Sequence, residues 1–127
     1  MEAYDPLNPP DPDEWQDLDE GERFILVEDH HRRHRVKLPN AQMHAVFHVI
    51  VENQIALGDE IPVGAEAERL VGERLDRHEA VHAVGSVLAN HMQGLMGGDT
   101  APGDNEQYYD ELRSLKAAEW LEEYSTE

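Results

Sequence analysis

The chain contains no cysteine, so neither disulfide bonds nor thiolate metal ligands are available to it. Aromatic residues make up only 6% of its 127 residues, so aliphatic side chains must fill most of any core. It has no apolar run of about 18 residues, the length of a membrane-spanning helix, and its acidic start does not resemble a secretory signal. These absences predict a cytoplasmic protein without a membrane segment.

Positive charge is scarce, because 10 Lys and Arg residues stand against 28 Asp and Glu residues and the formal net charge is −18. A phosphate backbone is repelled by such a field unless basic residues form a separate face. The basic cluster from His31 to Lys37 is too short to form one. We therefore expect no nucleic-acid partner, and we interpret the acidity as a contribution to solubility.

The spacing of apolar residues predicts an all-α fold, a bundle of about five helices that forms a single domain over residues 13–127. Residues 1–12 hold four of the seven prolines and are expected to form an extended or disordered lead-in. The first helix is expected to start at Asp11-Pro12, with Pro12 in the first helical position, and to run to about residue 34. The others are expected at about 40–57, 62–75, 76–96 and 104–124.

Capping residues mark several of the expected helix ends. Asn40, Asp76 and Asp104 are suited to be N-caps, and Gly58 is suited to end the second helix. Glu79 follows Asp76 by three residues, which makes a variant of the capping box. These residues support the boundaries that the apolar period indicates.

Two matched histidine pairs are the chemically informative feature. His44 and His48 lie on the second expected helix, and His78 and His82 lie on the fourth. A separation of four residues puts both imidazoles of a pair on the same helix face, where they can reach one metal ion. If consecutive helices alternate in direction, the second and fourth run parallel, and the four histidines converge at one end of the bundle.

Two carboxylates accompany the histidines. Glu52 lies one turn beyond His48, and Glu79 lies between His78 and His82. The unit Glu79-x-x-His82 is the one that di-iron bundles use, although this chain has only part of their ligand set and a homodimer would have to complete it. Zinc or iron suits such ligands. The candidate metal ligands are His44, His48, Glu52, His78, Glu79 and His82.

Residues 78–82 also match the H-E-x-x-H motif of zinc proteases, in which the glutamate activates water. Gly85 fits the extended form of that motif, but Leu88 stands where a third histidine would be. A metal-dependent hydrolase, with Glu79 or Glu52 as the base, is therefore one alternative function.

A non-catalytic alternative is an interaction module, working as a homodimer, in which the histidines are structural. Histidines at the margin of an apolar face are often hydrogen-bonded to a nearby carboxylate, and Glu52 and Glu79 can serve as such partners. A third group, His30, His31 and His34, is expected to form a solvated helix end.

The segment 44–96 resembles DUF1841, a bacterial family of unknown function. The similarity rests on His44-x-x-x-His48, the sequence Val51-Glu52-Asn53-Gln54, Pro62, and Asp76-x-His78-Glu79-x-x-His82. It covers about the middle half of the chain. The resemblance implies an all-helical domain in which the six candidate ligands belong to one shared signature, and it brings no activity with it.

Overall fold

The computed structural model describes residues 1, 3–33, 41–97 and 105–124. Within these ranges the chain forms seven α-helices, one 3-10 turn (Gly58–Glu60) and no strand, so the all-α prediction is confirmed. No helix in these ranges has both the length and the apolar character to cross a membrane. The helices are α1 (Pro12–Asp17), α2 (Glu20–Arg33), α3 (Ala41–Ala56), α4 (Val63–Gly72), α5 (Arg77–Gly97), α6 (Asn105–Ser114) and α7 (Ala117–Tyr124).

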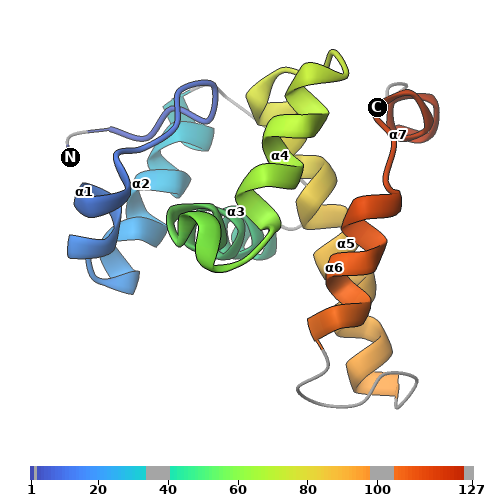
Figure 1. Ribbon diagram of the computed structural model, residues 1–127. Helices are drawn as coiled ribbons and strands as arrows, with labels where there is room; N and C mark the ends of the chain where they lie inside the picture. The colour runs from blue at the N-terminus through green and yellow to red at the C-terminus, as the bar shows by residue number, and fades with distance from the viewer. Residues whose placement is uncertain (2, 34–40, 98–104, 125–127) are drawn as a thin grey trace.

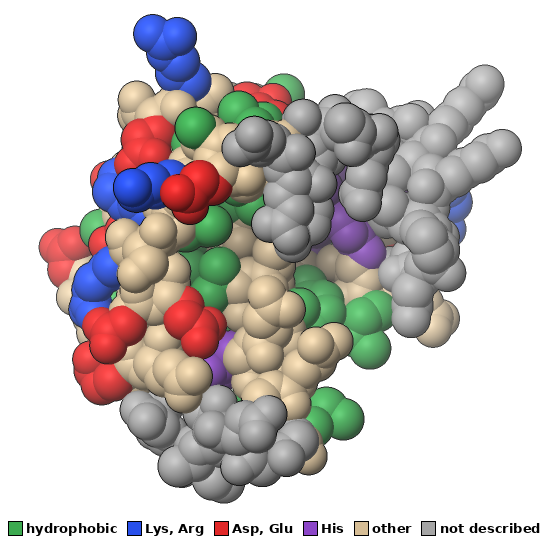
Figure 2. All heavy atoms as spheres, turned by 90° about the vertical axis from the view of Figure 1, so that its right-hand side faces the viewer, with side chains coloured by type: hydrophobic (Ala, Val, Ile, Leu, Met, Phe, Trp, Pro, Cys, Tyr) green, Lys and Arg blue, Asp and Glu red, His purple; other side chains and the backbone are tan. Residues whose placement is uncertain are grey.

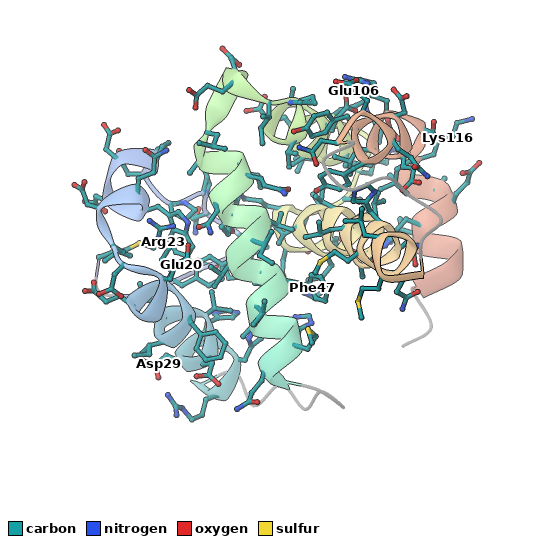
Figure 3. All side chains as sticks on the ribbon, turned by 90° about the horizontal axis from the view of Figure 1, so that it is seen from below. Glu20, Arg23, Asp29, Phe47, Glu106 and Lys116 are labelled. Carbon is teal, nitrogen blue, oxygen red and sulfur yellow. The ribbon has the colours of Figure 1, made fainter. Side chains whose placement is uncertain are left out.

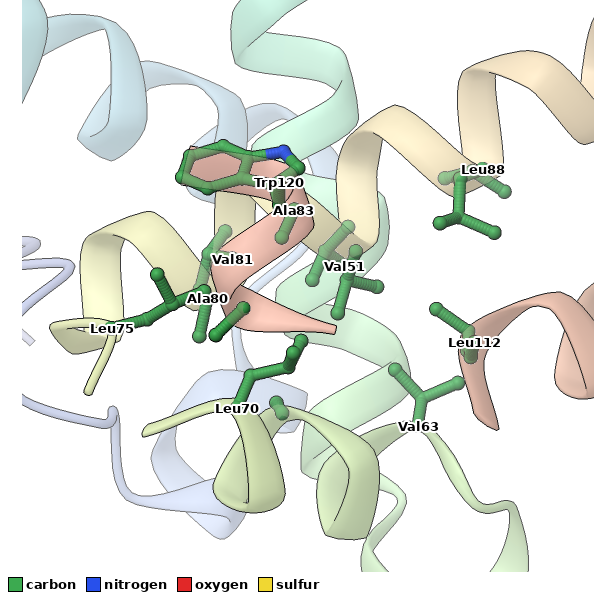
Figure 4. Packing of buried hydrophobic residues seen from close by; sticks show 14 of the residues in the cluster. Val51, Val63, Leu70, Leu75, Ala80, Val81, Ala83, Leu88, Leu112 and Trp120 are labelled. Carbon is green, nitrogen blue, oxygen red and sulfur yellow. The ribbon is translucent and has the colours of Figure 1, made fainter. Parts of the chain in front are cut away.

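Helix α3 occupies the middle of the molecule, with α1 and α2 on one side and α4 to α7 on the other (Figure 1). The larger hydrophobic core joins α3 to the C-terminal helices through side chains such as Val51, Leu70 and Leu112 (Figure 4). The smaller core joins α3 to the N-terminal part of the chain, where Tyr4 and Trp15 are each 1% exposed. Because both cores use α3, its polar face lies between them.

The first expected helix is interrupted, and this changes where its end lies. Helix α1 ends at Asp17, and α2 begins at Glu20 after a short break. The Asp19 carboxylate accepts a hydrogen bond from the backbone N–H of Glu22 at 2.8 Å, as an N-cap does. The spacing of apolar residues continues across this break, so the apolar pattern alone does not indicate it. The new direction packs α2 against α3.

The last expected helix is also interrupted, between α6 and α7. Arg69 of α4 donates hydrogen bonds to the carbonyls of Leu112 and Leu115 at 3.0 and 2.9 Å, which satisfies the end of α6. Glu73, one turn further along, accepts from the backbone N–H of Ala117 at 3.1 Å and so satisfies the start of α7. Side chains that are distant in sequence therefore stabilise this break.

Two of the predicted helix ends are confirmed. The backbone N–H of Glu79 donates to the Asp76 carboxylate at 2.7 Å, and the Glu79 carboxylate accepts from the backbone N–H of Asp76 at 2.9 Å. Gly58 follows the end of α3 with a φ of 63°, a left-handed conformation that glycine adopts without strain. The other two expected caps, Asn40 and Asp104, lie outside the described residues.

The expectation that the second and fourth helices run parallel is wrong. Helix α3 is seen end-on in Figure 1, where α5 lies in the plane, and Figure 3 shows α3 in the plane with α5 crossing it. A Cβ added to Gly85 of α5 would meet only Val51 Cγ2 of α3, at an ordinary distance of 4.0 Å, so the two helices could cross in this way with a larger residue there. The histidine pairs therefore meet at a crossing of two helices.

Candidate metal centre

The structure brings the two predicted histidine pairs together. The ring centroids are 4.7 Å apart within the pair His44 and His48, and 4.3 Å apart within the pair His78 and His82. Between the helices, the ring of His82 lies 4.6 Å from that of His44 and 4.9 Å from that of His48. The Nε2 atoms of His48 and His82 are 2.9 Å apart. All four imidazoles thus surround one small volume between α3 and α5.

Helix α2 adds histidines that were expected to be solvated. His30 and His31 are each only 6% exposed, so the prediction of a solvated helix end is wrong for both, and His34 lies outside the described residues. The ring of His31 is 4.8 Å from that of His44 and 5.0 Å from that of His48. The break before α2 is the physical cause, because it turns the end of this helix onto α3.

Two overlapping groups of three histidines have a metal-binding arrangement. One group is His31, His48 and His78, the other is His44, His48 and His82, and in each group the potential ligand nitrogens lie within 4.8 Å of one another. Zinc–nitrogen bonds of about 2.0–2.1 Å place tetrahedral ligand atoms about 3.3 Å apart, so modest ring rotations would seat an ion in either group. We call His31, His44, His48, His78 and His82 the histidine cluster.

Several nitrogens of the cluster are buried without a partner. In the described part of the chain, Nε2 of His31, His44 and His78 accepts or donates no hydrogen bond. Leaving a buried polar atom unsatisfied typically costs ~1–3 kcal/mol. An ion in the first group would satisfy the nitrogens of His31 and His78, and an ion in the second group would satisfy that of His44.

The hydrogen bonds behind His48 fix its tautomer. The Tyr4 hydroxyl donates to Oε2 of Glu52 at 2.6 Å, so the Tyr4 oxygen must accept from Nδ1 of His48, which is 3.1 Å away. Burial, and then the charge of Glu52, raise the pKa of Tyr4 well above its ordinary value, so the hydroxyl keeps its proton. With the proton on Nδ1, Nε2 of His48 accepts a hydrogen bond from Nε2 of His82 at 2.9 Å. A metal ion would take the place of this donor at the Nε2 lone pair.

Glu52 is buried as one half of an ion pair. Arg77 donates to its two carboxylate oxygens at 2.7 and 2.8 Å and to the carbonyl of Pro6 at 3.0 Å. Glu52 is only 1% exposed, and a bidentate guanidinium is the partner that compensates a buried carboxylate best. Glu52 thus supports His48 through Tyr4, and its own oxygens already have partners.

The imidazoles of the cluster are electrically neutral near pH 7. Burial is the main cause, and it lowers the pKa of His31 to about 4 and that of His82 to about 3. Burial also lowers the pKa of His44, His48 and His78, that of His48 well below its ordinary value. Neutral imidazole is the form that coordinates a metal ion, so no proton has to be removed first.

Glu79 has a structural place at the start of α5. One of its carboxylate oxygens accepts the backbone N–H of Asp76, and Glu79 belongs to neither group of three histidines. Glu52, the other proposed base, is bound to Arg77 and Tyr4. Both carboxylates thus have structural partners, which argues against the role of base that the H-E-x-x-H motif suggests for them.

Sequence reasoning missed His31, Tyr4 and Arg77 as parts of this site. The pattern Asp19-x-x-Glu22 is a capping signal that would have divided the first helix and redirected His31. The contacts of Tyr4 with His48 and Glu52 span 44 and 48 residues, and no local signal announces them. Among the residues that the structure describes, histidine is visible at small places on the face seen in Figure 2.

Comparison of the chain with protein-family models, curated proteins and solved structures finds no match. The resemblance to DUF1841 therefore stays a prediction, and function has to be inferred from the geometry.

Proposed function

We propose that this protein binds one divalent transition-metal ion through imidazole nitrogens of the histidine cluster. The observation that carries the proposal is the set of three buried Nε2 atoms, on His31, His44 and His78, that have no partner in the described residues. Each belongs to a group of three histidines whose ligand atoms lie within 4.8 Å of one another. A metal ion would bind such buried nitrogens and so remove the free-energy cost of leaving them without a partner.

A purely structural role for the histidines fits these contacts less well. Structural histidines in a core are normally hydrogen-bonded to carbonyls or carboxylates. Here the Glu52 carboxylate is paired with Arg77, and the Glu79 carboxylate accepts a backbone N–H at the start of α5. His31 has a backbone hydrogen bond with Val27, and His48 contacts Tyr4. The cluster rings otherwise face one another, with five pairs at centroid distances below 5 Å.

The charge of the ligands favours a single ion. Two divalent ions about 4 Å apart repel each other by ~16 kcal/mol at an effective dielectric constant of ~20. Sites with two metals offset this with bridging carboxylates, as di-iron bundles do. The cluster consists of neutral imidazoles, and Arg77 already neutralises Glu52. One ion per chain follows, and an all-imidazole site suits Zn²⁺ better than an iron centre of the carboxylate type.

The test is a titration of the full chain, purified without a metal-affinity column, with Zn²⁺ in competition with a chelator. A chain with 28 acidic residues also binds cations weakly at its surface, so a matched control is needed. His91→Ala provides it, because His91 is buried to 6% exposure on α5 but packs against Tyr108, outside the cluster. We expect one tightly bound ion in the wild type and in His91→Ala.

His48→Ala should remove this binding, since His48 belongs to both groups of three. Circular dichroism checks whether the variant remains helical, and His48→Gln is a milder second variant at the same position. Equal Zn²⁺ affinity in the wild type and in both cluster variants would overturn the proposal, as would a wild-type chain that takes up no ion.

A further inference from the structure

The two groups of three histidines share His48. Its Nδ1 is engaged with Tyr4, so only Nε2 is available, and that atom can bind one ion. The ion can therefore occupy one group or the other at a given time. In the inner position, formed with His31 and His78, two of the three histidines are buried; in the outer position, formed with His44 and His82, only His48 is buried.

We propose that the bound ion exchanges between the outer and the inner position, with His48 as its constant ligand, so that the protein carries a transferable ion rather than a fixed structural one. This inference rests on the proposed metal binding. Its chemical class of cargo is a divalent ion that accepts imidazole ligands, such as Zn²⁺ or Co²⁺.

The geometry places each departing ligand beside its replacement. Moving inward, the ion exchanges His44 for His31, whose ring centroids are 4.8 Å apart, and His82 for His78, whose centroids are 4.3 Å apart. In each substitution one metal–nitrogen bond forms as another breaks, and neither protons nor electrons are transferred. The ion therefore keeps His48 and at least one other imidazole throughout.

The number of ligands supports exchange. A closed structural zinc site has four protein ligands, often with thiolates that bind strongly. The cluster offers five neutral imidazoles in two overlapping sets. A surplus of neutral ligands lowers the barrier to substitution, because a new bond is available before an old one is lost.

The test is a Co²⁺ titration of four full-length proteins: wild type, His44→Ala, His31→Ala and the double variant. Co²⁺ is the probe because its visible absorption reports its ligands. When an ion can occupy either of two positions, the overall association constant is the sum of the constants of the two positions. Each single variant removes one position and should therefore retain one ion, with an affinity only a few-fold lower. The double variant should lose at least ~100-fold, which is far more than the two single effects combined.

Other patterns contradict the exchange. If one single variant loses all binding while the other behaves like the wild type, only one position exists, and the metal-binding proposal survives without the exchange. If the losses in binding free energy of the two single variants add up to the loss of the double variant, all the histidines hold one ion together. That result also overturns the exchange. No binding by the wild type refutes the proposed function itself. His78→Ala and His82→Ala repeat the test if His31→Ala or His44→Ala fails to fold.

Release of the ion provides a second readout. When Co²⁺-loaded protein is mixed with excess EDTA, His44→Ala should release its ion more slowly than the wild type, because the more exposed position is lost. Equal or faster release from His44→Ala would contradict exit through the outer position.

Discussion

Replacing Tyr4 with phenylalanine removes one oxygen atom from behind the metal centre and leaves the aromatic ring in the smaller core. In the wild type that oxygen accepts from Nδ1 of His48 at 3.1 Å and donates to Glu52 at 2.6 Å. Glu52 keeps its bidentate partner Arg77 in the variant. His48 loses the contact that fixes its proton on Nδ1, so its Nε2 lone pair is no longer assured.

Two magnitudes follow from this loss. Removing the partner behind a metal-bound histidine typically lowers metal affinity 10- to 100-fold, which corresponds to ~1.4–2.7 kcal/mol. The metal-free protein should also become less stable by ~1–3 kcal/mol, because a buried N–H of His48 is left without a partner. Tyr4→Phe should therefore affect metal binding and folding stability together.

Tyr108→Phe separates these two effects. Tyr108 is also buried, at 3% exposure, and its hydroxyl donates to Gln54 at 2.7 Å, outside the histidine cluster. This variant should lose a comparable amount of stability in urea unfolding and keep its Zn²⁺ affinity. If Tyr4→Phe binds Zn²⁺ as tightly as Tyr108→Phe does, the role assigned to Tyr4 is refuted.

Three further predictions concern stability. The metal-free protein should become less stable as the pH falls from about 7.5 to 5.5, because the unfolded chain takes up protons near pH 6.5 while folded His31 and His82, with pKa values of about 4 and 3, do not; a constant urea midpoint would contradict this. Glu79→Ala should destabilise the start of α5 by ~1 kcal/mol in urea unfolding and leave Zn²⁺ affinity unchanged, whereas a loss of Zn²⁺ would make Glu79 a ligand after all. Arg69→Ala should cost ~1–3 kcal/mol, measured in the same way, because two carbonyls at the end of α6 lose their donor; no change would mean that α6 ends without it.

The parts of the site that the sequence predicts are those that depend on local spacing. His44 with His48, and His78 with His82, lie four residues apart, and any α-helix places such pairs on one face. The capping box of Asp76 and Glu79 is likewise contained within four residues. The same locality leaves Glu79 open to two interpretations, because one short motif fits both a helix cap and a zinc-protease glutamate.

The parts that were missed depend on how the helices are placed relative to one another. His31 enters the cluster only because the chain turns before α2, and a periodic apolar pattern does not record that turn. Glu52 finds Arg77 across 25 residues, in a pairing that occurs only after α3 and α5 have crossed. Tyr4 lies in a proline-rich segment whose composition predicts extended chain but not its burial.

The most direct test of the central claim is X-ray absorption spectroscopy of the full-length protein loaded with one equivalent of Zn²⁺. We predict a first shell of at least three imidazole nitrogens at about 2.0–2.1 Å, which the His48→Ala variant should lose. A shell dominated by carboxylate or water oxygen, or one that is the same in His48→Ala, would show that the ion binds to acidic surface residues and would contradict a histidine metal centre.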